Sequence, residues 1–247
     1  MPESKAYALF SLLSTAFKNC LLAGLVLCST YVSSQSVNGN SSLGDKNSLS
    51  GKVSLSGKQA SKANISDVIV YFEPEKALSS LPLIDPYEIS MKGKAYHPRV
   101  SVIPRGSEVR ISNYDSIIHN AFSPSRSNPF DLGLYGKSDG KTHRFERTGV
   151  VRIFCNVHYH MVAYVLVLDT PFHTKVGSDG QFKLTDLPAG KGRLVFWHER
   201  ARQVVRKINL PYTGPLNINV PITKRRIPQH NNKSGKSYKK KRRRGRY

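Results

Sequence analysis

Short runs of β-favouring residues recur along most of this chain, and turn-forming residues separate them. Between residues 51 and 222 no long stretch shows the periodicity of an amphipathic helix. Gly, Pro, Asn, Asp and Ser divide runs that are rich in Val, Ile, Phe and Tyr. This pattern predicts an all-β fold, arranged as a sandwich or barrel. The expected strands cover residues 51–56, 67–73, 99–104, 107–112, 117–123, 149–155, 162–168, 180–185, 192–198, 202–209 and 215–220.

These runs fall into two groups, which predict two β-rich units. The first unit covers residues 51–171, and a small additional β-sheet unit covers 172–222. In the second unit the run from Asp179 to Gly190 alternates and then turns, as a hairpin does. Residues 51–73 can pair with either group, so the two units can interlock. Residues 35–50 are rich in Ser, Asn and Gly, which is typical of a linker.

The first 34 residues have the pattern of an export signal. Lys5 and Lys18 precede the apolar run at 20–28, and small residues follow before Gln35. The prediction is therefore a cleaved signal peptide at 1–34 and a periplasmic protein. The alternative is an uncleaved inner-membrane anchor, since residues 6–32 are long enough to span a bilayer.

Cleavage of that signal would leave Cys155 as the only cysteine of the mature protein. Cys20 and Cys28 both lie within the segment that would be removed. An exported protein with one thiol has no internal disulfide, so this cysteine needs another explanation. Either it is a buried, inert thiol, or a metal ion keeps it as a thiolate ligand.

Potential metal ligands surround this cysteine in the sequence. His158 and Met161 follow Cys155 at successive spacings of three residues, and His119 stands upstream. Residues three apart lie within ~7 Å of each other across a turn. Thiolate and thioether are soft ligands that favour Cu(I), and imidazole also suits copper. The set therefore predicts one mononuclear copper ion bound by these four side chains.

Two neighbouring residues qualify this ligand set. His160 alternates with His158 and is the alternative ligand, although the spacing of three favours His158. Asn120 follows His119 and is placed to hydrogen-bond near the thiolate, or to tie the two ligand segments together through a backbone hydrogen bond.

The two ligand segments carry a resemblance to a known family. The runs Ile117-Ile-His-Asn-Ala-Phe-Ser123 and Gly149-Val-Val-Arg-Ile-Phe-Cys-Asn-Val-His-Tyr-His-Met161 resemble the plastocyanin/amicyanin family of cupredoxins. The Cys-x-x-His-x-x-Met spacing is similar to that of amicyanin. A wider region over 51–200 resembles bacterial proteins labelled methylamine-utilisation or plastocyanin-like. The resemblance implies an eight-stranded Greek-key β-sandwich with a type-1 copper ion at one end, Met161 being the weak axial ligand.

Positive charge is concentrated at the C-terminus. The net charge is +22, and residues 224–247 contain twelve Lys and Arg and no acidic residue. With almost no apolar content, residues 223–247 are predicted to be a disordered basic tail. Behind an export signal, the expected partners of the tail are an anionic membrane, envelope polymers or an acidic protein, and nucleic acid is not an expected partner. The alternative is a solvated tail without a fixed partner.

The function predicted from these features is electron transfer by a type-1 copper protein that is not an enzyme. A basic surface suits an acidic redox partner, such as a c-type cytochrome or a dehydrogenase. One alternative is copper binding and handling in the periplasm without electron transfer. Another is a structural β-sandwich protein of the cell envelope, in which the metal site has no role.

Overall fold

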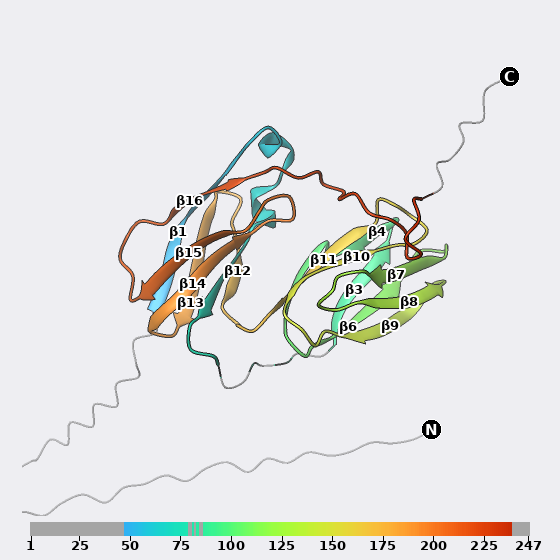
Figure 1. The fold of residues 1–247 in the computed structure, drawn as a ribbon, viewed down its shortest axis with the longest axis horizontal. Helices are drawn as coiled ribbons and strands as arrows, with labels where there is room; N and C mark the ends of the chain where they lie inside the picture. Colours follow the sequence, from blue (N-terminus) through green and yellow to red (C-terminus); the bar gives the residue numbers. More distant parts are fainter. Residues whose placement is uncertain (1–46, 79–80, 82, 84–85, 239–247) are drawn as a thin grey trace, which may run out of the picture. The chain divides into compact units, whose positions relative to one another are not determined.

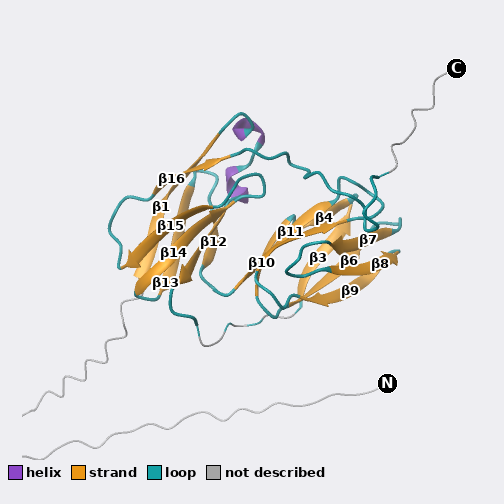
Figure 2. Ribbon diagram, in the orientation of Figure 1, coloured by secondary structure: helices purple, strands orange, loops and turns teal. Residues whose placement is uncertain are grey.

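The computed structural model describes residues 47–78, 81, 83 and 86–238. The predicted signal peptide and most of the predicted linker lie outside the described residues, as do the tail residues 239–247. In the described part of the chain, sixteen strands are accompanied by two short 3-10 helices, Ala60–Lys62 and Ile65–Asp67. Figure 2 shows this predominance of strands. The prediction of an all-β fold is confirmed. No helix within the described ranges is long and apolar enough to cross a membrane.

The first sandwich contains both predicted ligand segments. One of its sheets has the order β5-β11-β10-β7-β8, and the other has the order β4-β3-β6-β9 (Figure 1). The strands are β3 (Tyr87–Lys92), β4 (Ala95–His97), β5 (Val100–Pro104), β6 (Glu108–Asn113), β7 (His119–Ser123), β8 (Phe130–Tyr135), β9 (Ser138–Arg144), β10 (Gly149–Phe154) and β11 (Val162–Leu168).

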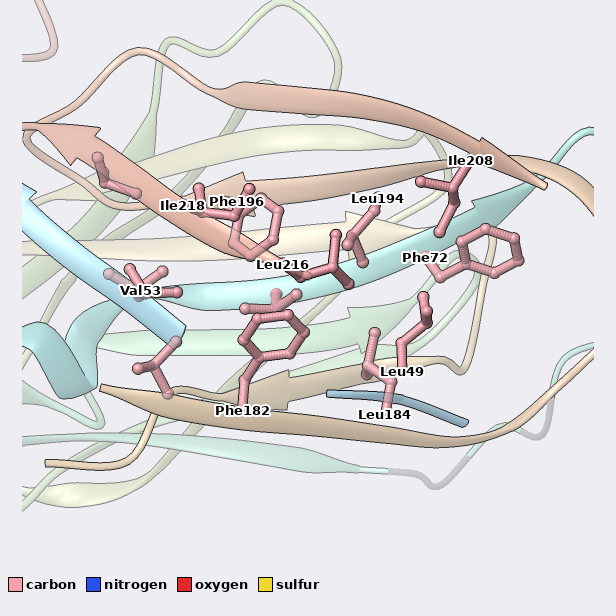
Figure 3. Packing of buried hydrophobic residues seen from close by; sticks show 14 of the residues in the cluster. Leu49, Val53, Phe72, Phe182, Leu184, Leu194, Phe196, Ile208, Leu216 and Ile218 are labelled. Atoms are coloured by element: carbon pink, nitrogen blue, oxygen red, sulfur yellow. The ribbon is translucent and has the colours of Figure 1, made fainter. Parts of the chain in front are cut away.

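The second sandwich combines strands from both ends of the described chain. Its sheets have the orders β13-β1-β16 and β12-β2-β14-β15. The strands are β1 (Asn47–Ser56), β2 (Ile69–Pro74), β12 (His173–Lys175), β13 (Gln181–Leu187), β14 (Gly190–Trp197), β15 (Val204–Leu210) and β16 (Asn217–Pro221). Phe72, Phe182 and Phe196 belong to the apolar core between these sheets, and Figure 3 shows them among their neighbours.

The pairing of β1 and β2 corrects the predicted limits of the first unit. β1 pairs with β13 and β16, and β2 pairs with β12 and β14. Residues 51–73 therefore belong with the second unit, which was the alternative pairing left open by the sequence. The sandwich that carries the ligand segments is built from residues 87–168, not from 51–171.

Strand β11 explains how one sandwich packs against the other. All seven of its side chains are buried. Ala163, Val165 and Val167 face the core of the first sandwich. The alternate side chains, such as Tyr164 and Leu166, join an apolar cluster with residues of β2 and β14. Because successive side chains of a strand point to opposite faces, one continuous apolar run contributes to both cores.

Candidate metal centre

The alternation of β7 and β10 directs two predicted ligands into the first sandwich. In β10, Val151 and Ile153 face its core, and Cys155 continues the same side just after the strand ends. In β7, Ala121 faces that core, so His119, two residues earlier, lies on the same side. β7 and β10 are neighbouring antiparallel strands. Both side chains are fully buried.

The remaining predicted ligands come from the short connection between β10 and β11. We call residues 155–161 the ligand loop. The backbone N–H of Met161 donates to the carbonyl of His158 at 3.1 Å, which closes a turn. Met161 is only 1 % exposed and lies in the same apolar core as Cys155. The loop thus brings an imidazole and a thioether to the end of the sandwich where the thiol lies.

Three ligand atoms converge on one point. The Cys155 Sγ lies 3.9 Å from the Nδ1 of His119 and 3.9 Å from the Nδ1 of His158. The two Nδ1 atoms are 3.1 Å apart. A point equidistant from the corners of that triangle is about 2.1 Å from each atom. Metal–nitrogen and metal–sulfur bonds at protein zinc sites are ~2.0–2.3 Å long, so the triangle is the right size for one transition-metal ion.

Asp115 fixes the orientation of the first imidazole. Its Oδ2 lies 2.8 Å from the Nε2 of His119. The pKa of Asp115 is lowered to about 2, chiefly because the backbone N–H of Lys94 donates to the carboxylate. An ionised carboxylate only accepts hydrogen bonds, so Nε2 carries the hydrogen and donates it. With the hydrogen on Nε2, the Nδ1 is the ring atom available as a ligand, and it lies near Cys155 and His158.

The facing nitrogen atoms of the two histidines cannot both present a lone pair to each other. Two lone pairs directed at each other across 3.1 Å repel, so either a proton or a metal ion must lie there. Burial lowers the pKa of His158, and the adjacent His119 and His160 lower it further. The structure therefore favours the neutral form of His158, which is the form that binds metals.

His160 does not take part in this convergence. Its ring centroid is 6.0 Å from that of His158, and its side chain is exposed. Within the described residues, the one group of side chains close enough to hold a metal ion is His119, Cys155 and His158, whose ligand atoms all lie within 4.8 Å of one another. The arrangement is consistent with His158, not His160, as the ligand of the loop.

Asn120 ties the two ligand segments together. Its Oδ1 accepts the backbone N–H of Asn156 at 3.2 Å, which is the second of the two roles inferred for it. Its Nδ2 donates to Asp131 at 2.8 Å and to the carbonyl of Gly133 at 2.7 Å. The carboxylate and carbonyl of β8 thus hold the amide that secures the ligand loop beside β7.

The donor set fits a metal ion that accepts soft ligands. A thiolate and two imidazoles in a triangle, with a thioether in the same buried region, is an arrangement typical of copper sites that transfer electrons. Zinc accepts thiolate and imidazole too, but structural zinc sites are mostly completed by a fourth Cys or His ligand. The nearby carboxylate of Asp115 binds the Nε2 of His119, not the Nδ1 that faces the other ligand atoms.

Sequence reasoning missed Asp115 and the contacts made by the C-terminal segment. Asp115 precedes His119 by four residues, and a carboxylate at that position was the available signal. Residues 223–238, which fall in the predicted disordered tail, make defined contacts: Lys233 pairs with Asp131 at 2.6 Å, and Tyr238 bonds the carbonyl of Cys155 at 2.8 Å. No motif or spacing in the sequence indicates these pairings.

Comparisons with known proteins found similarity only to solved structures. No protein-family model matches the chain, and no curated protein matches it. Among solved structures, a purple cupredoxin from Nitrosopumilus maritimus is 26% identical, covering 34% of this chain and 100% of its own, with a TM-score of 0.31. A reduced Cu(I) amicyanin variant is 14% identical, covering 40% and 98%, with a TM-score of 0.32.

A copper-containing nitrite reductase from Thermus scotoductus is also similar. It is 24% identical, and the match covers 39% of this chain and 25% of the reductase, with a TM-score of 0.31. The similar structures thus include both small cupredoxins and part of a larger enzyme.

Proposed function

We propose that this chain is an exported type-1 copper protein that carries single electrons between redox partners. The observation that carries the proposal is the triangle formed by the Cys155 Sγ and the Nδ1 atoms of His119 and His158. Two imidazoles and a thiol whose ligand atoms converge, with the thioether of Met161 in the same buried core, favour copper that changes oxidation state.

A copper ion held here would supply the one-electron couple, and the protein would restrict the movement of its ligands. His119 is oriented by Asp115, and the ligand loop is secured by Asn120. Cys155 and Met161 are buried in the core. Because the ligands are held before a metal binds, the site would change little between oxidation states, and electron transfer would need little rearrangement. This rigidity favours electron transfer over copper handling, which requires easy release.

Apolar side chains are exposed close to the ligands in the sequence. Ile118 precedes His119 and is 56 % exposed, and Val157 in the ligand loop is 48 % exposed. Leu134, which pairs with Asn120 across β7 and β8, is 54 % exposed. Exposed apolar residues suit contact with a protein partner. The net charge of +22 favours an acidic redox partner, such as a c-type cytochrome or a dehydrogenase. Export to the periplasm rests on the sequence of residues 1–34.

An electron carrier without catalysis of its own is the simpler proposal. Within the described residues there is one group of potential metal ligands, and a second metal centre of the kind that a nitrite-reducing enzyme uses is not among them. Catalytic activity would be detected as turnover of nitrite or a phenolic substrate by the copper-loaded protein.

Titration with Cu(II), followed by visible spectroscopy and voltammetry, tests the proposal. We expect one copper ion per chain, an intense thiolate-to-copper absorption band, and a reversible one-electron wave. A protein that binds only Cu(I), stays colourless and yields its metal readily to a chelator would support copper handling instead. A protein that binds no copper in excess metal would support the structural alternative.

A further inference from the structure

The C-terminal segment packs directly on the ligand loop. The ring of His230 stacks between two aromatic rings, with centroids 4.0 Å from Phe154 and 4.5 Å from Tyr159 and interplanar angles of 15° and 1°. Phe154 immediately precedes Cys155, and Tyr159 immediately follows His158. The imidazole of His230 therefore contacts the residue just before Cys155 and the residue just after His158.

Further along the segment, Lys233 binds the loop through its backbone and β8 through its side chain. Its N–H donates to the Oδ1 of Asn156 at 3.0 Å, and its Nζ lies 2.6 Å from Asp131. The backbone N–H of Asn156 is already bonded to Asn120. The C-terminal segment, the ligand loop and the strand of His119 are thus joined by one chain of hydrogen bonds. Burial opposes ionisation of Asp131, but the bonds from Lys233 and Asn120 outweigh it and lower the pKa of this carboxyl.

Tyr238 reaches the residue that supplies the thiolate. Its hydroxyl donates to the carbonyl oxygen of Cys155 at 2.8 Å. Its ring lies edge-on to Tyr159 and to His230, with centroids 5.3 Å away in both cases. The hydroxyl thus satisfies a backbone acceptor where β10 gives way to the ligand loop.

The segment is also held where it leaves the second sandwich. The backbone N–H groups of Thr223 and Lys224 donate to the carbonyl of Arg200. The guanidinium of Arg99 donates to the carbonyl of Arg226 at 2.8 Å. Contacts therefore also hold the chain just before the part that covers the loop.

We propose that residues 229–238 form a strap that completes the metal centre by holding the ligand loop closed, with Tyr238 acting as a positioning residue for Cys155. The metal-binding part of this inference rests on the proposed function. For a bound ion to leave, Cys155 and His158 must move apart, and this movement requires the contacts of His230, Lys233 and Tyr238 to break. The strap should therefore slow metal release and restrain the loop in the metal-free protein.

The hydrogen bond from Tyr238 should also affect the metal electronically. A donor on the carbonyl of Cys155 withdraws electron density from the ligand residue and so favours the reduced metal. Hydrogen bonds around a ligating cysteine are among the features that tune the potential of such a site. A purely structural strap would change the release rate but leave the potential unaltered.

The experiment compares Tyr238→Phe and His230→Ala with wild type in the full chain, and Tyr212→Phe serves as the matched control. Tyr212 lies between β15 and β16 in the second sandwich. We expect copper loss to a chelator to be about tenfold faster or more in both strap variants, as for other residues that support metal ligands. The reduction potential should fall in Tyr238→Phe. Release rates and potentials equal to those of Tyr212→Phe would overturn the proposal.

Amide hydrogen exchange of the metal-free protein separates failure of the strap from failure of the proposed function. The strap should protect amides 156–161, and His230→Ala should raise their exchange at least tenfold, which corresponds to an opening free energy lowered by about 1.4 kcal/mol. Unchanged exchange in that variant would refute the strap even if copper binds. Faster exchange in a protein that binds no copper would uphold the strap and refute the copper function.

Discussion

The Nδ1 atoms of His119 and His158 lie 3.1 Å apart, although the residues are separated by 39 positions in the chain. Asp115 binds the Nε2 of His119, and the carbonyl of His158 accepts the backbone N–H of Met161 in the turn of the ligand loop. Two facing nitrogen acceptors need a cation or a proton between them. The metal-free protein is therefore expected to hold one proton at this place, and a metal ion that binds there should displace it.

Replacing Asp115 with Asn should weaken copper binding by about 10–100-fold. The amide lacks the negative charge of the carboxylate. That charge makes His119 a stronger electron donor to a metal ion and fixes its tautomer. Competition with a chelator of known affinity measures the change. Asp169→Asn is the matched control, because Asp169 forms an exposed ion pair with Arg105 on the surface. Equal affinity in the two variants would contradict the role given to Asp115.

The choice between the two histidines of the loop can be tested with a pair of variants. His158→Ala should abolish the thiolate-to-copper band, because one corner of the ligand triangle is lost. His160→Ala should keep the band, since its exposed ring lies away from the triangle. Visible spectra of both copper-loaded proteins decide the question. Loss of the band in His160→Ala alone would assign the ligand to His160.

Replacing Met161 tests its role as an axial ligand. Met161→Gln offers an oxygen donor, which is harder than a thioether and should lower the reduction potential below that of Met161→Leu. The Leu variant keeps the volume of the buried side chain and should cost less than about 1.5 kcal/mol of stability. Voltammetry and thermal unfolding measure the two effects. Identical potentials in both variants would show that residue 161 does not contact the metal.

The protonation of His158 should change the stability of the metal-free protein in a defined direction. Burial and the adjacent histidines lower its pKa, so it should titrate below the ordinary value of ~6.5. In the unfolded chain the same ring binds its proton more tightly. The free energy of unfolding should therefore decrease as the pH falls below about 6.5. Imidazole NMR signals followed against pH test this, and a midpoint at or above the ordinary value would contradict it.

Most of the strands that the sequence patterns missed lie at the edges of the sheets. The apolar run of β11 is buried on both faces, and β10 buries Val151, Ile153 and Phe154. Both strands were predicted almost residue for residue. β3, β4, β8, β9 and β12 were missed, and all of them except β3 are edge strands of their sheets. Edge strands bury less surface, so polar residues and glycine interrupt their alternation. The polar run of β9, from Ser138 to Arg144, has no apolar side chain at all.

The ligands were predictable because they cluster in the sequence, but their supports were not. Cys155, His158 and Met161 are spaced along one loop, and the family resemblance implied His119. Tyr238 and Lys233 meet the same loop from positions 83 and 77 residues away from their partners, Cys155 and Asn156. Contacts over such distances depend on the folded arrangement of both sandwiches. In the sequence, these residues stand within a basic stretch that looks like a free tail.

X-ray absorption spectroscopy of the copper-loaded protein tests the central claim most directly. The proposed centre predicts a first shell of two nitrogen atoms and one sulfur atom at about 2.0–2.3 Å, with a weak longer sulfur contribution from Met161. A first shell of nitrogen and oxygen alone, without the sulfur of Cys155, would contradict the convergence of the three ligand atoms on one ion.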